Sequence, residues 1–75
     1  MMITTASNTG IVPNEGLAHV AGAVVIQVFR TPQAGILIQA RRDGRIVPQW
    51  CSQHDLDSAA MRRYDELVAA VGNAA

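Results

Sequence analysis

The chain has 75 residues, with six arginines, six acidic residues and no lysine, so its formal net charge is zero. This length supports one small domain near the lower limit for an unassisted core, and such domains often gain stability by pairing with a second copy. The neutral balance also differs from the clear basic excess of general nucleic-acid-binding proteins.

The composition favours a cytoplasmic protein of bacterial or phage origin. A single cysteine excludes an internal disulfide and indicates a reducing compartment. The N-terminus has no positively charged region ahead of an apolar run, so we expect no secretory signal. The longest apolar run, Leu17 to Phe29, is too short and too interrupted to span a membrane. The absence of lysine beside abundant alanine and arginine suggests a GC-rich genome.

The N-terminal part is polar and rich in turn-forming residues. We therefore expect a flexible N-terminal arm over residues 1–16, followed by a single small domain over residues 17–75. The segment Leu17–Gly22 leads into the first strand, and Gly22 marks a bulge or a bend in the chain.

Three strands are predicted from runs of β-branched residues that are separated by turn-forming residues. They cover Ala23–Arg30, Ile36–Arg41 and Arg45–Trp50. The first turn contains Pro32 and ends at Gly35. Because a proline cannot donate a hydrogen bond to a strand ladder, Pro48 places the third strand at an edge of the sheet.

The register of the second hairpin decides which side chains are buried. A two-residue turn at Asp43-Gly44 would place Ile46 on the same face as Arg41, whereas a three-residue turn that includes Arg42 would pair Arg41 with Arg45. A one-residue slip exchanges the two faces of a strand, so we prefer the three-residue turn, which gives one continuous apolar face. That face contains Val24, Ile26, Val28, Ile36, Ile38, Ala40, Ile46, Pro48 and Trp50.

The C-terminal third predicts one helix, from about Asp55 to Val71. Ser52 and Asp55 are spaced as in a capping box, and Gly72-Asn73 is a typical C-terminal stop. Apolar residues recur at helical spacing at Leu56, Ala60, Tyr64, Leu67 and Val71. The predicted fold class is therefore α+β: a three-stranded antiparallel β-meander with one C-terminal α-helix packed on one face.

Reactive side chains group only at Cys51-Ser52-Gln53-His54-Asp55. A nucleophilic cysteine needs a positioned base and an oxyanion site, and a zinc site needs about four ligands. Helix-capping residues beside a half-buried thiol explain the group more simply. We expect no catalytic residue, no metal ligand and no cofactor, and an enzyme built on Cys51 and His54 is the weakest of three functional hypotheses.

The second face of the predicted sheet is too apolar for an ordinary surface and too polar for a core. It carries Val25, Gln27, Phe29, Leu37, Gln39, Arg41, Val47 and Gln49. Such a mixture fits a protein interface or a nucleic-acid platform, and the neutral net charge favours protein. The N-terminal arm is a further candidate cover for this face.

Three arginines, Arg41, Arg42 and Arg45, cluster at the second turn. They form either a solvated hairpin tip or a contact for an anionic partner. The second hypothesis is accordingly a nucleic-acid-binding module that uses these arginines and Phe29.

The favoured hypothesis is a small non-enzymatic protein-binding module that forms a homodimer. Its expected partner-binding residues are Val25, Gln27, Phe29, Leu37, Gln39, Arg41, Arg42, Arg45 and Val47. In size and neutral charge the chain is similar to phage- or plasmid-encoded accessory proteins that bind or inhibit a host protein.

Overall fold

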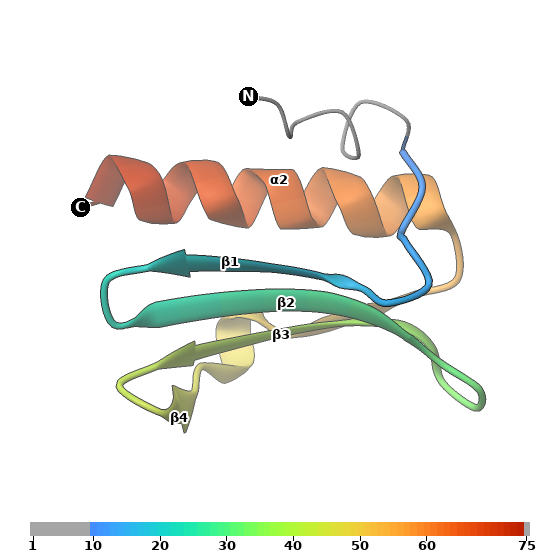
Figure 1. The fold of residues 1–75 in the computed structure, drawn as a ribbon, viewed down its shortest axis with the longest axis horizontal. Coiled ribbons are helices and arrows are strands. Elements are labelled where there is room, and N and C mark those ends of the chain that lie inside the picture. The colour runs from blue at the N-terminus through green and yellow to red at the C-terminus, as the bar shows by residue number, and fades with distance from the viewer. Residues whose placement is uncertain (1–9, 75) are drawn as a thin grey trace.

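The computed structural model describes residues 10–74, and side chains as far as Val71. An antiparallel sheet forms one layer and a single C-terminal helix forms the other, which confirms the α+β fold class (Figure 1). The elements are β1 (Leu17–Ala21), β2 (Val24–Thr31), β3 (Gly35–Arg42), β4 (Arg45–Ile46), the 3-10 turn η1 (Pro48–Trp50), β5 (Ser52–His54) and α2 (Asp57–Ala74). Within the described residues no helix is both long and apolar enough to cross a membrane.

The sheet has five strands in the described part of the chain, rather than the predicted three. The segment expected to lead into the sheet is itself a strand, β1, which pairs with β2 through a tight turn at Gly22-Ala23 and forms one edge of the sheet. The predicted third strand is divided into β4, η1 and β5. Both β4 and β5 pair with β3, so the opposite edge consists of two short pieces separated by a turn.

The β3–β4 hairpin closes through a two-residue turn, so the predicted three-residue turn is wrong. Arg42 lies opposite Arg45, and Arg41 lies opposite Ile46. The backbone at Asp43-Gly44 has φ angles of 55° and 79°, the left-handed values that a type I′ turn requires at both positions. The twist of this turn type matches that of the flanking strands, which favours the shorter connection.

The apolar pattern after this turn is misleading because the chain leaves the strand early. Pro48 begins a 3-10 turn rather than continuing β4. Ile46 and Pro48 are therefore exposed instead of buried, and Ile46 retains 44% of its accessible surface. Trp50 is half-buried and packs against the edge of the core.

The core lies between α2 and the sheet face that points toward it. The six residues of β2 and β3 that the alternation predicts to be buried are buried: Val24, Ile26, Val28, Ile36, Ile38 and Ala40. The helix contributes Ala60, Met61, Tyr64, Leu67 and Val71. Because these elements enclose one continuous cluster, the domain has one core in its described residues, and the helix supplies a large part of it.

The helix begins later than the sequence predicts, at Asp57 rather than Asp55. Ser52 is not its cap, because Ser52 lies in β5 and its hydroxyl is 2.8 Å from His54 Nε2. Leu56 therefore precedes the helix and is 66% exposed instead of buried.

The C-terminal end of α2 continues through the predicted stop at Gly72-Asn73 to Ala74. A glycine inside a helix costs only about 1 kcal/mol relative to alanine, which packing of the preceding turns readily offsets. Arg63 and Glu66 form an exposed ion pair of 3.4 Å one turn apart, as their spacing predicts.

Asp57 joins three segments that are distant in the sequence. Its Oδ2 accepts a hydrogen bond of 3.0 Å from the backbone N–H of Val12, and its carboxylate forms a salt bridge with Arg30. Arg30 Nη2 also donates to the carbonyl oxygen of Val12 at 2.9 Å. Val12 is only 1% exposed and belongs to the core. Of the expected arm, residues 1–9 lie outside the described residues.

This arrangement predicts a pH-dependent contribution to stability. The Arg30 guanidinium, and next the Val12 N–H, hold the pKa of Asp57 below its ordinary value of 3.8. In acid the unfolded chain therefore binds a proton at Asp57 before the folded chain does, and stability falls as the pH falls through the lowered pKa. We expect Asp57→Asn to have a lower Tm than the parent at pH 7, with a smaller difference at pH 3. Thermal denaturation by circular dichroism measures both, and a difference independent of pH would contradict the role of charge.

Candidate functional site

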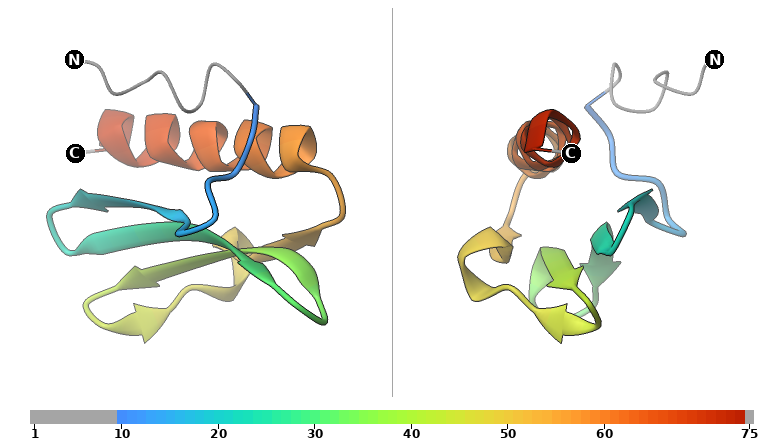
Figure 2. Two further views of the ribbon diagram at one scale, coloured as in Figure 1. Left: turned by 45° about the vertical axis from the view of Figure 1, so that its right-hand side comes forward. Right: turned by 90° about the vertical axis from the view of Figure 1, so that its left-hand side faces the viewer.

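The side chains that point away from α2 form a continuous surface, which we call the free face. The strand register assigns to it the alternate residues of the three long strands: Ala18, Val20, Val25, Gln27, Phe29, Leu37, Gln39 and Arg41. The helix lies on the other side of the sheet, where its contacts are with β1, β2, β3 and β5 (Figure 2). Among the described elements, none packs as a layer over the free face.

Six of the predicted partner-binding residues meet on the free face: Val25, Gln27, Phe29, Leu37, Gln39 and Arg41. The prediction missed Ala18 and Val20 because it did not assign β1 as a strand, and Val20 is 66% exposed. Val47 does not join this face as a strand residue. It lies between β4 and η1, and its N–H donates to the carbonyl oxygen of Ala40 at 2.9 Å.

The free face carries opposite charges near its two ends. Arg41 lies opposite Val25, at the end where β1 and β2 are joined, whereas Phe29 and Leu37 form the other end. Glu15 lines a shallow hollow of about 200 Å³ at that second end together with Phe29. The middle of the face is neutral and contains two glutamines opposite each other, Gln27 and Gln39.

The arginines predicted as one cluster divide between the two sides of the sheet. Successive residues of a strand point to opposite faces, so Arg41 belongs to the free face while Arg42 points to the helix side. Arg45 pairs with Arg42 and shares its side. All three are exposed, and together they surround the β3–β4 turn.

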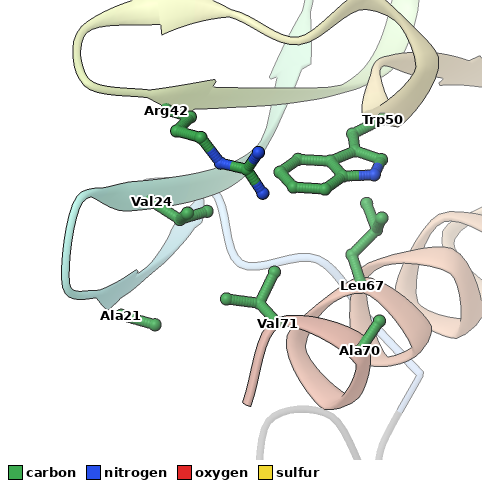
Figure 3. A pocket seen from close by; sticks show the side chains of 7 residues that line it. All are labelled: Ala21, Val24, Arg42, Trp50, Leu67, Ala70 and Val71. Carbon is green, nitrogen blue, oxygen red and sulfur yellow. The ribbon is translucent and has the colours of Figure 1, made fainter. Parts of the chain in front are cut away.

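A pocket of about 200 Å³ opens on the helix side, between α2 and the end of the sheet (Figure 3). We call it the helix-side pocket. It is lined by Ala21, Val24, Arg42, Trp50, Leu67, Ala70 and Val71. The Arg42 guanidinium carbon lies 5.0 Å from the centre of the Trp50 ring, a cation–π contact, and Leu67 and Val71 lie across the pocket from these two side chains.

The sequence gives little signal for this pocket. Its walls come from β1, β2, β3, η1 and α2, and only their packing brings these elements together. Trp50 is predicted as a core residue and Arg42 as part of the turn. The short turn at Asp43-Gly44 could have indicated that Arg42 shares a face with Val24.

Cys51 and His54 lie close in sequence but have separate partners. The Cys51 thiol donates to the carbonyl oxygen of Val47 at 3.4 Å. His54 Nε2 is hydrogen-bonded to Ser52 at 2.8 Å, on the side of β5 that faces the helix. In residues 10–74 no group of three or more histidine, cysteine, aspartate or glutamate side chains could hold a metal ion.

Comparison of the chain with protein-family models, with curated proteins and with solved structures finds no match. The functional argument consequently depends on the chemistry and geometry of the two surfaces described above.

Proposed function

We propose that this chain is a small, non-enzymatic protein-binding module that forms a homodimer through its free face. The observation that carries this proposal is the partly exposed apolar surface on β1–β3, on the side of the sheet opposite the helix. Val25, Phe29 and Leu37 are only partly buried there, and Val20 is largely exposed. Small monomeric proteins seldom leave such a patch open to water, because its burial against another surface is favourable.

The composition of the free face suits a protein partner. Its aliphatic and aromatic side chains lie on both sides of two central glutamines, which can hydrogen-bond across an interface without the desolvation cost of a charge. The zero net charge means that two copies approach without long-range repulsion.

The two charged ends favour a particular arrangement of two copies. In a face-to-face dimer the two-fold axis lies in the interface. An axis that runs across the strands reverses their direction, and so places the Arg41 end of one copy over the Glu15 end of the other. An axis parallel to the strands would instead place Arg41 over Arg41. Charge complementarity therefore favours the first arrangement.

The nucleic-acid hypothesis has less support. Arg41 is on the free face with Phe29, but Arg42 and Arg45 point to the other side of the sheet. A nucleic-acid platform needs several cations beside its stacking residue, and the free face offers one arginine within its strands. A phage- or plasmid-encoded inhibitor of a host protein remains the alternative use of the same face, with a foreign protein in place of the second copy.

Replacing Phe29 with glutamate is expected to convert the dimer to a monomer while the domain stays folded. An aromatic side chain that is buried in an interface often contributes about 2 kcal/mol, so the dissociation constant should rise by roughly 30-fold. Light scattering gives the solution mass, and circular dichroism reports the fold. Leu56→Glu is the matched control, because Leu56 is an exposed apolar residue just before the helix and outside the free face.

A charge exchange tests the arrangement of the two copies. Arg41→Glu and Glu15→Arg should each weaken the dimer, and the double variant should restore it in part.

A parent that is monomeric at high concentration would exclude the homodimer. In that case, deletion of residues 1–9, the part of the expected arm that precedes the core residue Val12, tests the arm as the cover of the free face: a loss of stability would support it. An unchanged stability would favour a foreign protein as the partner of the free face.

A further inference from the structure

We propose that the helix-side pocket binds a small amphipathic anion: an apolar group that enters the pocket, attached to a carboxylate that pairs with Arg42. This site lies on the opposite side of the sheet from the free face, so the proposal is independent of the dimer. It depends on three features of the described residues: an apolar cavity, a positioned guanidinium at its mouth, and a second arginine beside the first.

The cavity exists because small residues line it where larger ones would fill it. Ala21 of β1 and Ala70 of α2 contribute only methyl groups, while Val24, Leu67 and Val71 form apolar walls. Its volume of about 200 Å³ is below the range of roughly 300–1,000 Å³ that is usual for drug-sized ligands. The pocket therefore fits a short aliphatic chain or a single ring.

Arg42 is held in position by Trp50. The contact with the indole ring, 5.0 Å from guanidinium carbon to ring centre, restricts a side chain that would otherwise be flexible. A guanidinium has five N–H groups, so the contact with the ring leaves donors for hydrogen bonds to a ligand. A planar fork of donors matches the two oxygens of a carboxylate.

Arg45 adds a second positive charge next to the first. Arg42 and Arg45 lie directly opposite each other on neighbouring strands, a pairing that is unfavourable for like charges. Among the described residues the ion pairs within 4.0 Å are Arg30–Asp57 and Arg63–Glu66, and neither includes these two arginines. An anion bound at the mouth of the pocket would relieve this repulsion, whereas a cation would increase it.

Trp50 is the only tryptophan of the chain and reports directly on this site. Titration of the full chain with hexanoate should change the Trp50 fluorescence in a saturable way, with a dissociation constant on the order of 1 mM for so small a ligand. Hexylammonium and hexanol have the same alkyl chain without the negative charge. We expect no saturable binding of hexylammonium, and binding of hexanol at least about tenfold weaker, the loss of one charge-assisted contact.

Three variants locate the site, with amide NMR shifts as a second readout because Arg42→Gln itself alters the surroundings of Trp50. Arg42→Gln should weaken hexanoate binding by about tenfold or more. Arg62→Gln is the control, an exposed arginine of α2 that does not line the pocket, and should leave binding unchanged. Ala70→Leu should abolish binding by filling the pocket, and because Ala70 is exposed the variant should fold normally.

Four results would overturn the proposal. They are the absence of saturable hexanoate binding, equal binding of hexanoate and hexylammonium, retention of binding in Ala70→Leu, and amide shifts that gather on the free face instead of around Val24 and Val71. Inorganic phosphate serves as a competitor without an apolar group. If it displaces hexanoate with an equal or higher affinity, the arginines form a simple anion site and the apolar part of the proposal is wrong.

Discussion

Leu67→Asp is expected to leave the chain unfolded at 25 °C. Leu67 is 3% exposed and belongs to the cluster between α2 and the sheet. An unpaired carboxylate in that position costs several kcal/mol, which is comparable with the total stability of about 5 kcal/mol expected for a domain of this size. The parent should show a cooperative thermal transition by circular dichroism, and the variant should show none.

Ala69→Asp is the control for this experiment. Ala69 lies on the same helix but is exposed, so the same new charge remains in water. This variant should keep a transition within a few degrees of the parent, since exposed substitutions usually change stability by less than about 0.5 kcal/mol beyond helix propensity. If Leu67→Asp also kept a native-like transition, the packing of α2 on the sheet would be wrong.

Gly16→Ala is expected to cause the second largest loss of stability. Gly16 has a φ of +79°, and a methyl group at this position would lie 2.7 Å from the carbonyl oxygen of Val28 and 3.2 Å from Phe29 Cβ. Backbone strain and steric overlap together should cost about 2 kcal/mol or more, and lower the Tm by roughly 10 °C. Chemical denaturation and thermal melting measure the two quantities.

Gly22→Ala separates the two causes. Gly22 also has a positive φ, +61°, but a methyl group there would meet no atom within 4 Å. Only the conformational cost of about 1 kcal/mol should remain in this variant. Equal losses in the two variants would mean that the backbone beside Gly16 moves aside, and that the close contact with Val28 contributes nothing.

The sequence predicts the buried positions most reliably where apolar residues recur with a regular spacing. In β2 and β3 β-branched residues recur at every second position, and each of these positions from Val24 to Val28 is buried as expected. The helical stripe that includes Leu67 is equally clear. In both elements, burial against a single neighbouring layer imposes a period that can be read without the structure.

The prediction fails where short segments depend on their neighbours. β1 contains Leu17, Val20 and two alanines around a histidine, a pattern too weak to identify a strand without its pairing to β2. The Asp43-Gly44 pair is a strong signal for a two-residue turn. The apolar pattern favours the longer turn only if the strand continues to Trp50, and Pro48 instead begins a 3-10 turn.

The contacts that define the sites are less accessible still to sequence reasoning. The hydrogen bond between Val12 and Asp57 joins residues 45 positions apart, and no local pattern relates them. No local pattern predicts the helix-side pocket either, because it depends on the small side chains of Ala21 and Ala70, which leave the cavity unfilled. The free face could be predicted in part, since its residues alternate with those of the core along β2 and β3.

The two edges of the sheet differ in a way that limits assembly. Among the described residues, β1 presents an unpaired backbone edge. It contains no charged residue and no proline, either of which would discourage pairing with another chain. The opposite edge is interrupted by Pro48 and η1 between two very short strands. If two copies joined through β1, each would turn its interrupted edge outward, and a third copy would find only two short strands to extend. Association at the backbone edges would therefore stop at two copies and would not extend into a fibre.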